Sequence, residues 1–106
     1  MANIEIYTWS TCRFSRRAKQ LLDRKGVSYT EYTIDGDEVA RDAMVARGTN
    51  GKRTVPQIFI NDRHIGGSDD LYLLEKQGEL DGLLNQSEVN AIHSKLLHEQ
   101  QKYADL

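Results

Sequence analysis

The sequence predicts an α/β protein with a four-stranded mixed sheet and helices on both faces. Three observations predict this fold class. Strand-like and helix-like segments follow one another through residues 1–84 in the order βαβα and then ββα. The first two strands flank a helix, which predicts a parallel pair with a right-handed crossover. The last two flank only Asn61-Asp62, a turn typical of an antiparallel hairpin.

Each expected strand has a strand-like pattern or composition. Residues 4–8 alternate apolar and polar side chains, and residues 27–34 are rich in β-branched and aromatic residues. The third strand begins beside the only proline in the chain. The four predicted strands are residues 4–8, 27–34, 55–60 and 63–65.

The expected helices combine apolar residues at helical spacing with recognisable ends. Gly26 terminates the first helix, Asp35-Gly36-Asp37 leads into the second, and Ser68 is a favourable N-cap for the third. The predicted helices are residues 13–25, residues 37–48 and residues 68–78, followed by a short closing element over residues 80–84.

Composition narrows the class of protein. A chain of 106 residues with 39% hydrophobic and 28% charged residues predicts one soluble globular domain. The net charge of −2 implies no general attraction to nucleic acid or to an anionic membrane surface. We find no signal peptide, and no apolar run approaches the roughly 18 residues of a membrane span. A single cysteine cannot form an internal disulfide, so we expect a reducing, cytoplasmic location.

The last 22 residues, 85–106, differ from the domain predicted over residues 1–84. Their apolar residues recur at helical spacing, which predicts an amphipathic helical extension. These residues are Val89, Ile92, Leu96 and Tyr103. We favour a helix packed on its own domain, in a monomer, over a dimer or partner contact.

Cys12 lies where the first strand ends and the first helix begins. The free N–H groups and the positive dipole end of a first helical turn favour an anion, and a thiolate is one. Arg13, Arg16 and Arg17 add cationic charge nearby. These surroundings favour a reactive thiol with a lowered pKa over a buried structural cysteine.

Three motifs at consistent separations give the chain a resemblance to a known family. They are the segment Tyr7 to Ser15, the segment Thr54-Val55-Pro56-Gln57-Ile58-Phe59-Ile60, and the segment His64 to Tyr72 with its Gly-Gly-x-Asp-Asp core. Together they resemble the bacterial class I glutaredoxins over residues 3–84. The resemblance implies a thioredoxin-like fold and glutathione as the cofactor.

The chain departs from the family pattern at three positions. Ser15 stands where the second, resolving cysteine of Cys-Pro-Tyr-Cys would be, which leaves the monothiol sequence Cys12-Arg13-Phe14-Ser15. Trp9 stands where related members often have a lysine that helps to bind glutathione. Ser68 stands where some relatives have a third cysteine.

The resemblance implies roles for individual residues. Cys12 is the nucleophile, and Arg13, Phe14 and Ser15 support it. The implied glutathione-binding residues are Arg53, Thr54, Val55, Pro56, Gly67, Ser68 and Asp69. Among these, Val55 would offer its backbone N–H and C=O to an extended glutathione, and its bond to Pro56 would be cis, although a trans bond is the expectation without the resemblance.

Simpler roles remain open for several of these residues. Arg53, or less strongly Lys52, would hold a glutathione carboxylate or be a solvated loop cation. Gly67-Ser68-Asp69 would bind the γ-glutamyl end or only cap the helix. Phe14 would flank the ligand or pack in the core.

We expect a glutathione-dependent thiol-disulfide oxidoreductase that reduces glutathione mixed disulfides, with glutathione and glutathionylated proteins as partners. The alternative is an iron–sulfur carrier, in which one Cys12 thiolate from each of two chains and two glutathiones ligate a [2Fe–2S] cluster. A third interpretation is a trapping variant in which serines replace cysteines. His64, His93 and His98 are too scattered for a metal site within one chain.

Overall fold

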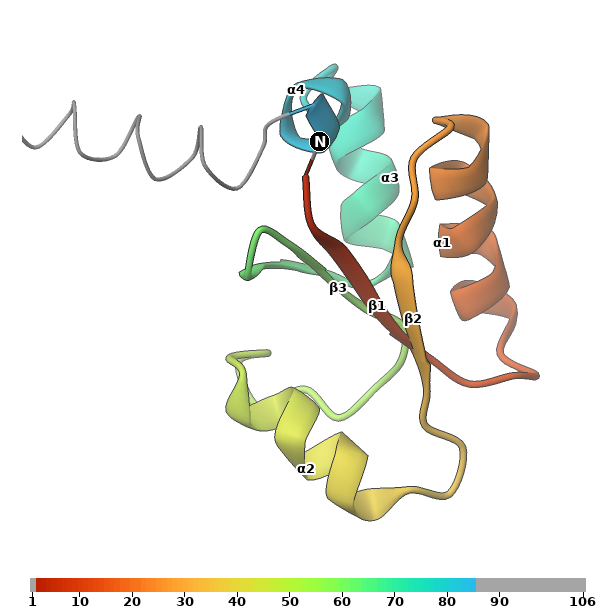
Figure 1. Ribbon diagram of the computed structural model, residues 1–106, viewed down its shortest axis with the longest axis vertical. Helices are drawn as coiled ribbons and strands as arrows, with labels where there is room; N and C mark the ends of the chain where they lie inside the picture. Colours follow the sequence, from red (N-terminus) through yellow and green to blue (C-terminus); the bar gives the residue numbers. More distant parts are fainter. Residues whose placement is uncertain (1, 86–106) are drawn as a thin grey trace, which may run out of the picture.

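The computed structural model describes residues 2–85, in which a four-stranded sheet lies between two helical layers (Figure 1). The strand order is β2-β1-β3-β4. β1 pairs in parallel with β2 and antiparallel with β3, and β3 pairs antiparallel with β4. The strands are Ile4–Thr8 (β1), Thr30–Thr33 (β2), Gln57–Ile60 (β3) and Arg63–Gly66 (β4). The mixed sheet and its parallel and antiparallel pairs are therefore confirmed.

Two strands are shorter than the sequence predicts. β2 is an edge strand with four exposed residues, and only the part opposite Glu5 to Thr8 pairs with β1. β3 begins at Gln57 and not at Val55, because Pro56 has no N–H to donate to a ladder. The hairpin turn is as expected, with positive φ at both Asn61 and Asp62.

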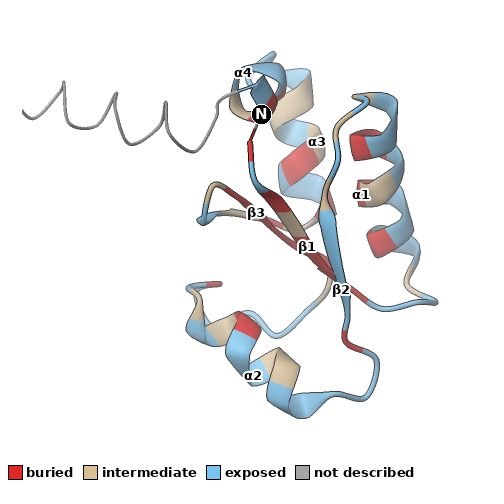
Figure 2. Cartoon of the chain, viewed as in Figure 1, coloured by how far each residue is buried: buried red, intermediate tan, exposed pale blue. Residues whose placement is uncertain are grey.

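The helices cover both faces of the sheet, as predicted (Figure 1). They are Arg13–Arg24 (α1), Glu38–Ala46 (α2), Ser68–Lys76 (α3) and Leu80–Asn85 (α4). α1, α3 and α4 pack on one face, where they share a core with Ile4, Ile6 and Ile58. α2 covers the other face through Met44, which packs with Tyr7 and Phe59. β1 thus sends alternate side chains into two cores, both visible as buried residues in Figure 2.

The N-terminus of α3 differs by one residue from the expected cap. Gly67 is the N-cap and Ser68 is the first helical residue. The cap comes from Asp70, whose carboxylate accepts a hydrogen bond of 2.9 Å from the Gly67 N–H. Gly66 has a φ of +123°, and a Cβ there would collide with the Asp70 carboxylate, so this junction requires glycine. The Ser68 hydroxyl is thereby left for another role.

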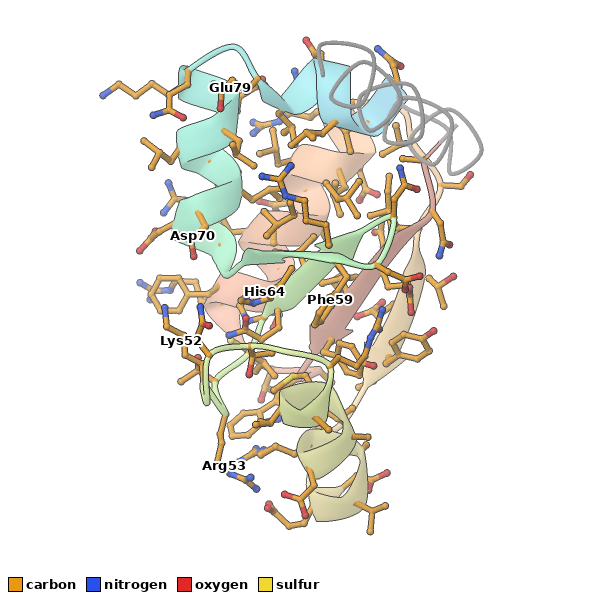
Figure 3. All side chains as sticks on the ribbon, turned by 90° about the vertical axis from the view of Figure 1, so that its left-hand side faces the viewer. Lys52, Arg53, Phe59, His64, Asp70 and Glu79 are labelled. Atoms are coloured by element: carbon orange, nitrogen blue, oxygen red, sulfur yellow. The ribbon has the colours of Figure 1, made fainter. Side chains whose placement is uncertain are left out.

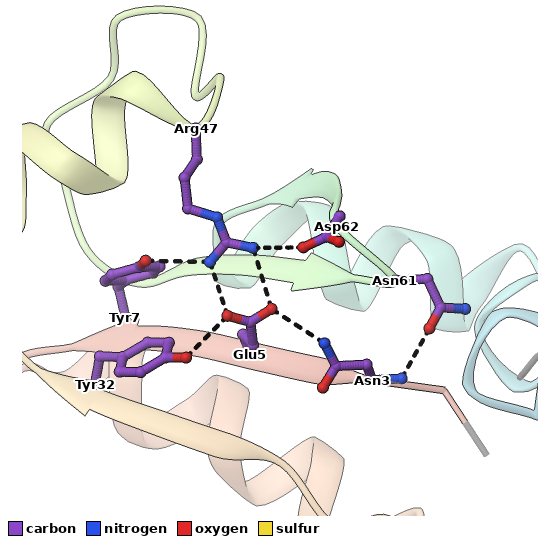
Figure 4. Close-up of polar contacts among 7 residues, drawn as sticks. All are labelled: Asn3, Glu5, Tyr7, Tyr32, Arg47, Asn61 and Asp62. Carbon is purple, nitrogen blue, oxygen red and sulfur yellow. Dashed lines mark hydrogen bonds and ion pairs between the residues drawn. The ribbon is translucent and has the colours of Figure 1, made fainter. Parts of the chain in front are cut away.

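A polar network joins the end of α2 to the sheet (Figure 4). Arg47 donates to both carboxylate oxygens of Glu5 at 2.9 and 3.1 Å and to the Tyr7 hydroxyl at 3.1 Å. It also reaches Asp62 in the hairpin turn at 3.1 Å, and the Tyr32 hydroxyl donates to Glu5 at 2.9 Å. Burial raises the pKa of Glu5, but the bonds from Arg47 and Tyr32 lower it by more, so the carboxylate is ionised.

The predicted extension falls almost wholly outside the described residues. Only Asn85 is included, as the last residue of α4. Within residues 2–85, no helix has both the length and the apolar character that a membrane crossing needs.

Candidate functional site

The strand-to-helix junction places Cys12 at the N-cap of α1. Its backbone is extended, with φ −81° and ψ 123°, and its side chain is partly exposed. The preceding loop is fixed because the backbone N–H and the hydroxyl of Ser10 donate to the Asp35 carboxylate at 2.9 and 2.7 Å. The sulfur therefore has a defined position at the surface.

The immediate neighbours of Cys12 on α1 stabilise its thiolate. Burial raises the pKa of the thiol, but the hydroxyl of Ser15 and the backbone N–H groups of Ser15 and Phe14 lower it by more. The net effect is a pKa below the ordinary value for cysteine. Ser15 is completely buried, and its Oγ also accepts a hydrogen bond of 3.3 Å from the Trp9 N–H. It is thus more than an ordinary residue of the first turn.

We expected the three arginines near Cys12 to add to the stabilisation of its thiolate. Arg13 and Arg16 are exposed, and the guanidinium of Arg17 lies 4.4 Å from the centre of the Tyr72 ring. Their charges are not among the causes of the lowered pKa. The hydrogen bonds at the helix N-terminus account for the shift.

The segment before β3 lies against the cysteine. The Cys12 Sγ is 3.8 Å from the Val55 carbonyl oxygen, and the Val55–Pro56 bond is cis. Gln57 supports this segment by donating to the Thr54 carbonyl at 3.1 Å. Its amide oxygen is 2.6 Å from Nε2 of His64, which must be the donor because the oxygen can only accept. Burial lowers the pKa of His64, which favours the neutral ring.

A groove of about 290 Å³ runs from this segment to the start of α3. Seven of the predicted site residues line it, namely Phe14, Thr54, Val55, Pro56, Gly67, Ser68 and Asp69. Lys52, Gln57 and Asp70 complete the lining. Neither Gln57 nor Asp70 is among the predicted site residues, although the position of Asp70 three residues after the N-cap is a recognisable signal.

The end of the groove at α3 offers groups of both polarities. The first turn of α3 presents N–H groups and a positive dipole end, which suit a carboxylate. The carboxylates of Asp69 and Asp70 suit a cation. Ser68 is 4% exposed, and its hydroxyl oxygen is buried with no hydrogen-bond partner within residues 2–85. A zwitterionic group fits this end of the groove.

Lys52 and Arg53 leave their loop in different directions (Figure 3). Lys52 lies on the side of Asp70 and lines the groove. Arg53 turns toward α2, where it forms ion pairs of 2.8 Å with Asp42 and 2.9 Å with Glu38. It lines a second pocket on the Trp9 side of Cys12 and not the groove. Within residues 2–85, no three His, Cys, Asp or Glu side chains are grouped to hold a metal ion.

Comparisons with known proteins agree on one family. A sequence model described as Glutaredoxin matches residues 4–65. A probable glutaredoxin of Synechocystis sp. is 64% identical over 84 residues, which cover 79% of this chain and 94% of the relative. Glutaredoxin 3 of Escherichia coli is 56% identical over 84 residues, 79% of this chain and 99% of the relative. The crystal structure of a buckwheat glutaredoxin–glutathione complex superposes with a TM-score of 0.71 at 28% identity, covering 78% of this chain and 76% of that one.

Proposed function

Since the chain belongs to the glutaredoxin family, we propose that it reduces mixed disulfides of glutathione by a monothiol mechanism at Cys12. One observation carries the proposal: the only cysteine in the chain has Ser15 as its neighbour on α1. The Ser15 hydroxyl stabilises the Cys12 thiolate, but it cannot attack a disulfide as a second cysteine would.

The reaction proceeds in two exchanges. The Cys12 thiolate attacks the glutathione sulfur of a glutathionylated protein, which forms a Cys12–glutathione disulfide and releases the protein thiolate. A second glutathione thiolate then attacks the glutathione sulfur on Cys12. This step releases oxidised glutathione and restores the Cys12 thiolate. In the net reaction one glutathione thiolate and the mixed disulfide give the protein thiolate and oxidised glutathione, and the cycle is of the ping-pong type.

The groove between the Thr54 to Pro56 segment and α3 is the proposed glutathione site. The Val55 backbone would pair with the extended tripeptide, because its carbonyl lies beside the reactive sulfur. Gly67, Ser68 and Asp69 would hold the zwitterionic γ-glutamyl end, since the start of α3 offers donors for its carboxylate and an acid for its ammonium group.

Two cations are candidates for the glycyl carboxylate of glutathione. Arg53 would have to exchange its ion pairs with Asp42 and Glu38 for the ligand. These pairs are exposed to solvent, so the exchange costs little. Lys52 already lines the groove and needs no such exchange.

The first experiment is mass spectrometry of the protein after exposure to oxidised glutathione. We expect one added glutathionyl group on Cys12, and none on a Cys12→Ser variant. The same two proteins are then compared in turnover of a glutathionylated substrate with glutathione. A Cys12→Ser protein that turns over as fast as the unmodified chain would refute the proposal.

The alternative function is to carry a [2Fe–2S] cluster. The Cys12 thiolates of two chains and two glutathiones would be its ligands. The observation that favours it is the partly exposed Cys12 followed by Arg13 in place of the rigid proline of the family motif. Anaerobic reconstitution with iron, sulfide and glutathione tests it, and a colourless monomer would reject it.

A further inference from the structure

A series of hydrogen bonds runs from β4 to the segment that lines the proposed glutathione groove. Nε2 of His64 lies 2.6 Å from the Gln57 amide oxygen and donates to it. The Gln57 amide nitrogen in turn donates to the Thr54 carbonyl at 3.1 Å and to the Thr54 hydroxyl oxygen at 3.3 Å. Thr54 lines the groove, whereas His64 lines neither the groove nor the second pocket. An effect of His64 on a bound ligand would therefore pass through Gln57.

The sheet holds both Gln57 and His64 in place. Gln57 is the first residue of β3, pairs with Tyr7 of β1 and is 1% exposed. His64 pairs with Phe59 in the β3–β4 ladder, and the centres of the two rings are 5.2 Å apart (Figure 3). Because its neighbours are fixed by the sheet, the buried Gln57 amide is a rigid support for the segment before β3.

The proton on His64 sets which way the Gln57 amide faces. The oxygen and the NH2 group of a glutamine amide have nearly the same shape, so packing alone does not distinguish an orientation from its flipped form. In the flipped form the amide oxygen would face the Thr54 carbonyl oxygen, and neither atom can donate. With a proton on Nε2 of His64, the flipped form would also place two donors against each other. The Nε2–H tautomer of His64 thus keeps the Gln57 donors on Thr54.

The segment that the Gln57 amide supports stands outside the sheet. β3 begins only after Pro56, which has no N–H with which to extend the ladder. The proposed partner of glutathione in this segment is the Val55 backbone, whose carbonyl lies 3.8 Å from the Cys12 sulfur. Since Thr54 and Val55 are adjacent, a shift of the Thr54 carbonyl would move the Val55 backbone relative to the sulfur.

We propose that His64 is a positioning residue for glutathione: through the Gln57 amide, it holds the Thr54 carbonyl, and with it the Val55 backbone, in the position that binds the tripeptide. The inference rests on the proposed function and adds to it a residue of β4 that lines no part of the groove. A neutral imidazole has one N–H, and the Gln57 oxygen assigns it to Nε2.

Two substitutions of His64 separate its hydrogen bond from its ring. His64→Phe keeps a ring against Phe59 but has no donor, whereas His64→Gln loses the ring and places an amide N–H near the Nε2 position. We expect His64→Phe to weaken glutathione binding roughly fivefold, the size of one neutral hydrogen bond, and His64→Gln to restore most of the affinity. Calorimetric titration with reduced glutathione in a Cys12→Ser background measures this affinity without turnover. Arg63→Gln, at the exposed neighbour of His64 on β4, is the matched control and should leave the affinity unchanged.

Kinetics and a double-mutant cycle test whether the effect passes through Gln57. With the mixed disulfide of glutathione and 2-mercaptoethanol, His64→Phe should raise KM roughly fivefold and change kcat little. The pH midpoint of Cys12 alkylation should stay the same, because the Ser15 and Phe14 donors remain. Gln57→Leu should weaken glutathione binding at least as much as His64→Phe does, and adding His64→Phe to Gln57→Leu should weaken it no further.

Proton–nitrogen NMR of the histidine rings identifies the tautomer directly, and the signal that His64→Gln removes belongs to His64. We expect this signal to show the proton on Nε2. The inference is overturned if the proton is on Nδ1, if His64→Phe binds glutathione as tightly as the Cys12→Ser parent, or if His64→Gln is weakened as much as His64→Phe. If the affinities follow the expected order but the unmodified chain turns over no mixed disulfide, the proposed function fails and the positioning role stands.

Discussion

Three donors at the start of α1 converge on the Cys12 sulfur: the Ser15 hydroxyl and the N–H groups of Ser15 and Phe14. The sequence predicts a lowered pKa, because Cys12 precedes a helix, but it also assigns part of the effect to nearby arginines. The side chain of Arg17 stacks on Tyr72 instead, and which way a surface arginine turns depends on a partner from a distant segment. The backbone donors were predictable and the arginine contacts were not.

Removing the Ser15 hydroxyl should raise the pKa of Cys12. A Ser15→Ala variant keeps both backbone donors but loses the side-chain hydrogen bond, so its thiolate is less stabilised. The rate of alkylation by iodoacetamide as a function of pH gives the midpoint for each protein. We expect a midpoint below the usual 8.5 or so for the unmodified chain and a higher one for Ser15→Ala.

The exposed Ser28→Ala is the matched control and should leave the midpoint unchanged. Equal midpoints for the unmodified chain and Ser15→Ala would mean that the hydroxyl does not stabilise the thiolate.

At the scale of elements, local patterns predicted most strands and helices, because their apolar spacing agrees with the faces that become buried. Alternate side chains of β1 enter the two cores, and α1 buries Ala18, Leu21 and Leu22 in one stripe. The cap of α3 is also a local contact, in which Asp70 takes the place expected for Ser68. Contacts between different elements were not predictable. Arg53 pairs with α2 and not with the groove, which depends on where α2 packs.

The network around Glu5 should contribute measurably to stability at neutral pH. Glu5→Gln leaves Arg47 without its main carboxylate partner, and we expect a loss of about 1–3 kcal/mol in the free energy of unfolding. Folding lowers the pKa of Glu5 from 4.5, so the contribution is present above the unfolded pKa and is lost as the pH falls through the folded pKa. Urea unfolding at neutral and at acidic pH measures both effects.

The difference between the unmodified chain and Glu5→Gln should therefore shrink in acid. Glu79→Gln, at an exposed position, serves as the control and should change stability little at either pH. A Glu5→Gln protein as stable as the unmodified chain at neutral pH would show that the network contributes no net stability.

Across the whole molecule, the topology gathers the site at one end of the strands. β1 ends there and leads to α1, β3 runs antiparallel and begins there, and β4 ends there and leads to α3 (Figure 1). Cys12, the segment before β3 and the start of α3 are therefore neighbours despite their separation in sequence. The motifs predicted the groove because each lies at a strand end. The second pocket, which Trp9 and Arg53 line, was missed because it depends on where α2 packs.

Residues 86–106, all but the first residue of the predicted extension, should not be needed for the chemistry. The relative from Escherichia coli aligns over 99% of its length with 84 residues of this chain, and all residues proposed for the site lie before Asn85. A chain truncated after Asn85 should therefore keep its kcat/KM for a glutathionylated substrate within about twofold, while its thermal stability or assembly changes. Steady-state kinetics and circular dichroism melting test this, and loss of turnover in a truncated protein that still folds would contradict it.

Monothiol chemistry at Cys12 can be tested by one comparison of two substrates. The unmodified chain and a Ser15→Cys variant are each given a glutathionylated protein and a protein with an ordinary disulfide, with glutathione and its recycling system. We predict that the unmodified chain reduces the first substrate and not the second, and that Ser15→Cys gains activity toward the second by forming an intramolecular disulfide. Reduction of the ordinary disulfide by the unmodified chain at the rate of the Ser15→Cys variant, or reduction of neither substrate, would contradict the account.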